Sequence, residues 1–213
     1  MKKKTVLILL LILFAVSACN LPSRQTKTPQ PSPTPAEGWQ YYSGKAIQIR
    51  LPDSYVEEDF KDELPAIIST LANIVHQSDG QVETYLNNLE GSVEWWGYDS
   101  AAPAISPTRL LILRNQDLAG LPLNLLSNTL MLLVGGDANA VRSETLKLDG
   151  RDVVRLSYSD QDSAWAAYAF NEEGFLWLSL FLTTPAILAV EQADFEYSVG
   201  TIVIDENALT PQP

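Results

Sequence analysis

VRSETLKLDGRDVVRLSY, residues 141–158, is the stretch that decides the fold. Residues 141–148 and 151–158 each have the composition of a β-strand, and Asp149-Gly150 separates them. An Asp-Gly pair between two such runs is a strong signal for a two-residue hairpin, because both positions accept the positive φ angles of a type I′ turn. The stretch therefore predicts an antiparallel pair of strands.

Downstream of this hairpin the strand pattern continues and then gives way to a helix. The expected elements are strands at 164–170 and 175–183, a turn at 171–174, a helix from Pro185 to about Tyr197 and a short extended end at 201–204. Thr184 fits the N-cap of the helix, and Pro185 fits its first position, where the missing N–H costs nothing.

Upstream of the hairpin, the spacing of apolar residues alternates between strand and helix periods. The expected elements are strands at 45–51, 93–98 and 108–114 and helices at 58–76, 80–90 and 118–134. Leu110-Leu111-Ile112-Leu113 is apolar on both faces of its strand, which predicts a central position in the sheet with cover on both sides. The order of elements predicts an α+β fold with a mainly antiparallel sheet.

Two segments of the chain resemble PsbP-like domains. Trp39-x-x-Tyr42 followed by Ile47-x-Ile49-x-Leu51-Pro52-x-x-Tyr55 is similar to the opening of these domains, and Phe195-Glu196-x-Ser198-x-x-Thr201-Ile202 is similar to their last helix. The resemblance covers about residues 38–205 and implies a three-layer α-β-α sandwich. Tyr55 stands where the family usually has tryptophan. No metal-binding position of plant PsbP maps onto a matching motif, so the resemblance does not imply the photosynthetic role.

The N-terminus has the pattern of a secretory signal that ends on a cysteine. Lys2, Lys3 and Lys4 precede an apolar run of 11 residues, 6–16, which is too short to span a membrane. Val16-Ser17-Ala18-Cys19 resembles the lipobox of bacterial lipoproteins, which implies cleavage before Cys19 and acylation of its thiol. The alternative is an ordinary secretory signal with an accidental cysteine.

Four segments of the chain follow from these assignments. Residues 1–18 are the expected signal peptide, 19–37 a lipidated cysteine with a Pro/Ser/Thr-rich tether, 38–205 the folded domain and 206–213 a polar tail. The proline-rich tether has almost nothing apolar to bury and has an extended reach of roughly 50 Å. Loss of the three signal-peptide lysines takes the net charge from −12 to −15, which disfavours nucleic acid as a partner.

Several residues carry chemistry in principle, and each has a structural alternative. His76 is the only histidine and lies near the predicted end of a helix without a marked nucleophile. Asp160-x-Asp162 is read as a turn rather than a calcium loop. Gly135-Gly136-Asp137 is read as a helix C-cap rather than a phosphate loop. The acidic residues are read as compensating a helix dipole rather than binding a cation; they are Glu57, Glu58, Asp59, Asp62 and Glu63.

Two aromatic clusters leave a similar choice. Trp95-Trp96 and Trp39-Tyr41-Tyr42 have the composition of a stacking platform for sugars or peptides. Adjacent residues on a strand point to opposite faces, so the alternative places one member in the core and the other under a helix or at an edge.

The sequence identifies no catalytic, cofactor-binding or metal-binding residue, and Cys19 is its one assigned site. The expected function is that of a membrane-anchored extracytoplasmic lipoprotein with a non-catalytic binding or assembly-factor domain. Its expected partners are the membrane, through the lipid on Cys19, and a protein. The alternative is a cell-surface hydrolase, which requires two carboxyl groups about 5–9 Å apart in a cleft.

Overall fold

The computed structural model describes residues 37–59, 92–104, 106–120, 122 and 141–209. Its strands are β1 Trp39–Ser43, β2 Ile47–Pro52, β3 Tyr55–Glu57, β4 Val93–Asp99, β5 Arg109–Asn115, β6 Arg142–Leu148, β7 Arg151–Ser159, β8 Ala164–Glu172, β9 Phe175–Thr183 and β10 Val203–Ile204. Its helices are α5 Pro185–Gly200 and α6 Glu206–Leu209. Pro35–Pro213 forms one compact unit.

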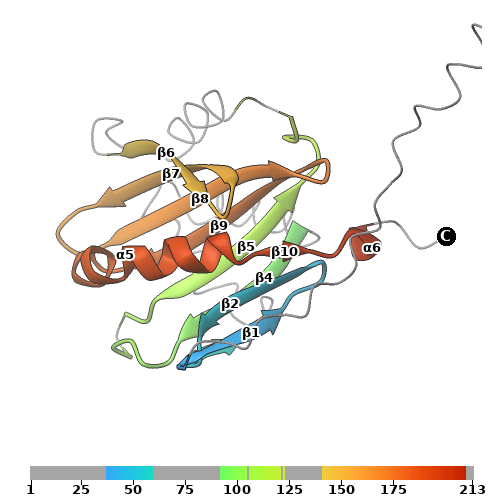
Figure 1. The fold of residues 1–213 in the computed structure, drawn as a ribbon. Helices are drawn as coiled ribbons and strands as arrows, with labels where there is room; N and C mark the ends of the chain where they lie inside the picture. The colour runs from blue at the N-terminus through green and yellow to red at the C-terminus, as the bar shows by residue number, and fades with distance from the viewer. Residues whose placement is uncertain (1–36, 60–91, 105, 121, 123–140, 210–213) are drawn as a thin grey trace, which may run out of the picture. The chain divides into compact units, whose positions relative to one another are not determined.

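The described strands form two antiparallel sheets. The larger has seven strands in the order β3-β4-β5-β9-β8-β7-β6, and the smaller has the order β1-β2-β10 (Figure 1). Every pair of neighbouring strands is antiparallel. β5 lies inside the larger sheet, and Leu110, Leu111 and Ile112 are all buried, so its predicted central place is confirmed. The predicted α+β class with an antiparallel sheet is confirmed as well.

Two-residue turns join β6 to β7 and β8 to β9. Asp149 and Gly150 have φ angles of 46° and 80°, so the Asp-Gly turn predicted between β6 and β7 is confirmed. The turn between β8 and β9 is shorter than expected, because strand pairing continues through Glu172 and Phe175. Glu173 and Gly174 make this turn with φ angles of 50° and 75°. The prediction of a turn across 171–174 was wrong at its first two residues, since ladder hydrogen bonds outweigh the polarity of Asn171 and Glu172.

Helix α5 covers one face of the larger sheet and contacts β2, β6, β8 and β9 (Figure 1). Its start is as predicted, with Thr184 accepting a hydrogen bond from the Ile187 N–H. Its buried side chains recur at helical spacing and include Phe195, whose ring stacks on Phe181 with centroids 4.2 Å apart. At its end, the Thr201 hydroxyl donates to the Ser198 carbonyl and accepts from the Arg50 N–H of β2. The helix therefore packs on the larger sheet through Phe195, and its C-terminal end is hydrogen-bonded to the smaller sheet through Thr201.

Glu94 joins the smaller sheet to the larger one. The register of β4 shifts between Val93 and Trp95, and Glu94 lies at this irregularity. Its side chain accepts a hydrogen bond of 2.7 Å from the Ala46 N–H and pairs with Arg114 at 2.9 Å. Gly44 permits this approach, because a Cβ there would lie 2.3 Å from the Glu94 carbonyl oxygen. The first hairpin therefore docks on β4 through backbone contact and one buried carboxylate.

The face of the sheet opposite α5 carries a second apolar cluster. Its buried members are Val141, Val154, Leu156, Trp165, Ala167 and Leu182. The predicted helices at 60–76 and 80–90 and most of the one at 118–134 lie outside the described residues. Residues 118–120 form a turn rather than the expected start of a helix. The Asn115 side chain accepts a hydrogen bond from the Leu118 N–H, but Gly120 has a φ angle of 77°, which a right-handed helix does not contain.

Four described elements add to or differ from the expected pattern. β1 and β3 flank the predicted strand at 45–51, and the chain continues as a strand after Pro52 because β3 pairs with β4. The short extended end pairs with β2 as β10, through Val203 with Gln48. The first four residues of the expected tail form α6, and Leu209 packs against the core. Among the described helices, none has both the length and the apolar character to cross a membrane.

Candidate functional site

Several predicted site residues lie outside the described residues. These are Cys19, Asp62, Glu63, His76 and Gly135-Gly136-Asp137. The interpretation of Asp160-x-Asp162 as a turn is confirmed, because one Asp160 oxygen accepts from the Asp162 and Ser163 N–H groups at 2.9 and 2.8 Å. These hydrogen bonds lower the pKa of Asp160 because they stabilise its charged form.

The described part of the early acidic cluster follows the edge of the larger sheet. Glu57 ends β3, and the Glu58 N–H donates to the Trp96 carbonyl oxygen at 3.1 Å. Glu58 and Asp59 are not helical, so their expected place at the start of a helix is not found within the described residues. The described residues of the acidic cluster therefore lie in and directly after strand β3.

The aromatic clusters divide between opposite faces, as their strand positions predict. Trp95 and Trp96 are each only 2 % exposed. Trp95 lies in the core beneath α5, where Tyr42 meets its ring edge to face at 5.7 Å. Trp39 packs edge to face on Tyr197 of α5, with centroids 4.8 Å apart. Because both rings of the Trp95-Trp96 pair are buried, the pair offers no open stacking platform.

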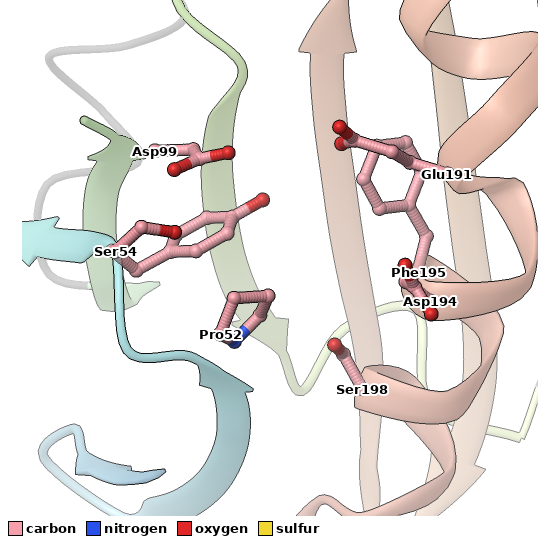
Figure 2. A pocket seen from close by; sticks show the side chains of 8 residues that line it. Pro52, Ser54, Asp99, Glu191, Asp194, Phe195 and Ser198 are labelled. Carbon is pink, nitrogen blue, oxygen red and sulfur yellow. The ribbon is translucent and has the colours of Figure 1, made fainter. Parts of the chain in front are cut away.

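A cavity of about 210 Å³ lies where the β2–β3 turn and the end of β4 face α5. Its lining residues are Pro52, Ser54, Tyr55, Asp99, Glu191, Asp194, Phe195 and Ser198. Figure 2 shows Asp99 and Ser54 on one wall and the α5 residues on the opposite wall. The Glu191 carboxylate and the Ser198 hydroxyl point from α5 into the space between the walls (Figure 2). The described structure therefore brings three carboxyl groups from two distant segments to one cavity.

Each cavity carboxylate is held in a different way. Asp99 is buried, and one of its oxygens accepts a hydrogen bond of 2.9 Å from the Ala101 N–H. Glu191 and Asp194 are three residues apart on α5, a spacing that places them on the same side of the helix. Burial and then the charges of Asp99 and Asp194 raise the pKa of Glu191. Asp194 is exposed, so the acidic side of the cavity reaches the surface.

Tyr55 supplies the aromatic wall of the cavity. Its side chain is 5 % exposed, and its ring centroid lies 6.3 Å from that of Trp95. Burial, followed by the negative charges of Asp99 and the two α5 carboxylates, raises the pKa of Tyr55 above its ordinary value. The phenol is therefore neutral at physiological pH. Phe195 adds a second apolar surface on α5.

The cavity is suited to holding a positively charged group rather than to a described catalytic constellation. Its charged lining residues are all acidic. No cluster of three or more His, Cys, Asp or Glu side chains within the described ranges has the geometry of a metal centre. A nucleophile–histidine pair is likewise missing from the described cavity walls, which carry Ser54 and Ser198 but no histidine.

Sequence reasoning did not single out Asp99, Glu191 or Asp194. The i, i+3 spacing of Glu191 and Asp194 was a visible signal that both lie on one face of the predicted helix. No sequence pattern predicts that this face of the helix lies opposite Asp99, which is 92 residues earlier in the chain. That meeting depends on the pairing of β5 with β9 and on the docking of α5 against β2.

Comparisons with known proteins find similar structures but no matching sequence family. No family model matches the chain, and no curated protein matches it. The chain is similar to cyanobacterial PsbP (CyanoP) from Synechocystis sp. PCC 6803, with a TM-score of 0.51 and 12 % identity over 82 % of this chain and 97 % of that one.

Two further structures resemble the chain less closely. A Bacteroides thetaiotaomicron VPI-5482 protein has a TM-score of 0.44 and 9 % identity over 78 % of this chain and 48 % of that one. A Pseudomonas aeruginosa protein of unknown function, described as a putative regulator, has a TM-score of 0.33 and 13 % identity over 50 % of this chain and 74 % of that one. The match to CyanoP carries the conclusion about architecture: the fold of this chain is α+β and PsbP-like.

Proposed function

We propose that this chain is a membrane-anchored extracytoplasmic lipoprotein whose folded domain binds a partner without catalysing a reaction. The anchor rests on one sequence feature, the 11-residue apolar run that ends in Val16-Ser17-Ala18-Cys19. Two or more acyl chains on one cysteine bind a membrane stably, whereas one chain binds only marginally. The proline-rich tether then carries the folded domain away from the lipid surface.

The cavity between α5 and the β2–β3 turn is the observation that supports a binding role. It brings Asp99, Glu191 and Asp194 together with an aromatic wall. A binding site is typically a hollow with apolar walls and a few convergent polar groups, and this cavity has both. The structural likeness to CyanoP supports the architecture of such a domain but does not identify its partner.

Two experiments test the two parts of this proposal. Labelled palmitate should be incorporated by the wild-type protein expressed in a bacterial host and not by Cys19→Ser. Equal labelling of the two, or none, would contradict the anchor. The intact lipoprotein should also capture a partner from its own membrane, and Glu191→Gln should reduce this capture more than Asp162→Asn, which makes the same charge change at an exposed turn.

A hydrolase that uses carboxylate chemistry is the second candidate, and the meeting of Asp99 with Glu191 and Asp194 in one cavity favours it. The raised pKa of Glu191 is also a property of general acids. Two observations favour binding instead. The described cavity walls place no exposed aromatic ring beside the carboxylates for a sugar to stack on, and Trp95 is too buried to do so.

Release of reducing ends from envelope polysaccharides distinguishes the two candidates. A hydrolase should release them in a time-dependent reaction that Asp99→Asn and Glu191→Gln both abolish. We expect no release above that of heat-denatured protein. Turnover by the wild type that both substitutions remove would replace the binding proposal with the hydrolase.

A further inference from the structure

The negative charge of the cavity is not paired with a lysine or arginine side chain among the described residues. Within the described ranges, the ion pairs of lysine and arginine go to Glu94, Asp152, Glu172, Glu144 and Glu196. None of these is a cavity carboxylate. Asp99 receives a backbone N–H, but this hydrogen bond uses only one of its oxygens. The cavity therefore concentrates negative charge that a ligand with positive charge would compensate.

The Ser198 hydroxyl is a second and independent feature of the cavity. Ser198 is only 1 % exposed, yet its side chain points into the cavity from α5 (Figure 2). Its carbonyl oxygen accepts from Thr201, whereas its hydroxyl has no hydrogen-bond partner among the residues that the structure describes. The hydroxyl lines the cavity, so a polar group that enters the cavity can form a hydrogen bond with it.

The walls limit which cation fits. A bare divalent ion needs six or more oxygens at about 2.0–2.6 Å, and the described carboxylates do not form such a cluster. The cavity volume of about 210 Å³ instead suits a cation that carries a hydrocarbon stem. Tyr55, Phe195 and Pro52 offer apolar surface to the stem, and an aromatic ring also attracts a cation.

An ammonium group suits the polar lining, because the carboxylates and the Ser198 hydroxyl can all accept a hydrogen bond. It has three N–H donors and no acceptor. Asp99 on one wall, Glu191 with Asp194 on the other, and the Ser198 hydroxyl are the acceptors that surround the space. A guanidinium pairs in one plane with the two oxygens of a single carboxylate, whereas an ammonium can take acceptors from several directions, and the lining carboxylates lie on two opposite walls.

We propose that this cavity binds a primary alkylammonium group, with the ammonium among Asp99, Glu191, Asp194 and Ser198 and its stem against Tyr55 and Phe195. This inference rests on the proposed binding function and names the chemistry that the site recognises. The two sources of such a group are a lysine side chain of a protein partner and a free polyamine. Both present the same ammonium and methylene stem to the cavity.

Titration calorimetry of the full-length protein in a non-ionic detergent tests the proposal. The probes are the peptide acetyl-Gly-Gly-Lys-Gly-Gly-amide, the same peptide with norleucine, the same peptide with arginine, spermidine, and calcium chloride. The lysine peptide should bind, and the norleucine peptide should not. Because the interaction is between charges, the affinity should also fall when the salt concentration is raised from 50 to 500 mM.

Variants locate the binding within the cavity. Glu191→Gln and Asp194→Asn lie on a helix surface, where folding tolerates them, and each should weaken the lysine peptide by about fivefold. Ser198→Ala should weaken it without changing net charge. Asp162→Asn removes one exposed carboxylate outside the cavity and should leave the affinity unchanged.

Each other result overturns the assignment. Equal binding of the lysine and norleucine peptides would show that the positive charge of the ligand plays no role. An equal effect of Asp162→Asn and Glu191→Gln would show that the peptide is attracted by the acidic surface in general and not by the cavity. Tighter binding of arginine or calcium assigns the cavity to another cation. Spermidine and the lysine peptide distinguish the sources, since the tighter ligand identifies the one that the cavity prefers. If palmitate labelling and partner capture succeed while no amine binds, the proposed function stands and this inference fails.

Discussion

Replacing Arg114 with methionine should isolate the cost of the buried carboxylate of Glu94. The Glu94 side chain is completely buried, and the Arg114 side chain is 22 % exposed. Methionine keeps an apolar stem beside Phe175, whose ring lies 5.2 Å from the Arg114 guanidinium. It removes the positive charge, and with it the ion pair to Glu94. After the substitution, the hydrogen bond from the Ala46 N–H remains the one polar contact of this carboxylate among the described residues.

The magnitude follows from the burial of the two partners. Removing one partner of a buried ion pair costs about 3–5 kcal/mol because the other charge remains uncompensated. Arg114 is partly exposed, so we expect a loss of about 3 kcal/mol at pH 7, the lower end of this range. The matched substitution Glu94→Gln removes the buried charge, and on that background Arg114→Met should cost less than about 1 kcal/mol.

The loss should depend on pH in a defined direction. Burial is the main cause that raises the pKa of Glu94, while the Ala46 N–H and then Arg114 lower it. A carboxyl whose folded pKa is raised binds a proton more tightly in the folded state, so folded stability is gained as the pH falls through that pKa. Removing Arg114 raises the folded pKa further. The difference between variant and wild type should therefore be full at neutral pH and vanish below about pH 4, where Glu94 is protonated even in the unfolded chain.

Urea unfolding followed by tryptophan fluorescence measures this prediction at pH 7 and pH 4, at constant ionic strength. The protein used is residues 35–213, which form one compact unit. A loss of equal size at both pH values would refute the electrostatic argument and assign the effect to packing. A loss of the same size on the Glu94→Gln background would refute the pairing itself.

Four further predictions concern the turns, the cavity and the domain as a whole. Gly44→Ala should cost about 1–3 kcal/mol in the same urea assay, because the new Cβ would lie 2.3 Å from the Glu94 carbonyl oxygen; an unchanged midpoint would show that the hairpin shifts freely. Gly150→Val should also cost about 1–3 kcal/mol, since a β-branched residue resists a φ angle of 80°, and a stable variant would contradict the turn. Glu191→Gln should stabilise the domain by about 0.5 kcal/mol at pH 7, a value kept small by solvent screening. Its carboxyl has a raised folded pKa, so the gain should disappear at acidic pH, and a gain that persists at pH 4 would point to packing. Residues 35–213 should unfold in one cooperative transition that a chelator does not shift, and a chelator-dependent midpoint would reveal a cation site.

Local sequence signals predicted the parts of the fold that depend on neighbouring residues. Asp149-Gly150 specified its hairpin because the turn geometry is set by the two residues themselves. Thr184 specified the start of α5 because capping acts within one helical turn. β3 escaped notice because three residues carry too little periodicity, and it exists by pairing with β4. The short extended end at 201–204 was predicted, but its pairing with β2 as β10 was not, because the partner strand lies far earlier in the chain.

The cavity is the clearest case of a feature that no local signal encodes. Asp99 ends a strand of the larger sheet, the β2–β3 turn connects the two sheets, and Glu191 belongs to a helix that follows the last strand of the meander. Their meeting requires α5 to lie against β2, which the Thr201 hydroxyl secures through the Arg50 N–H. A change that loosens this contact should therefore alter ligand binding without touching a cavity residue. In this domain the position of α5 links the stability of the fold to the properties of the proposed site.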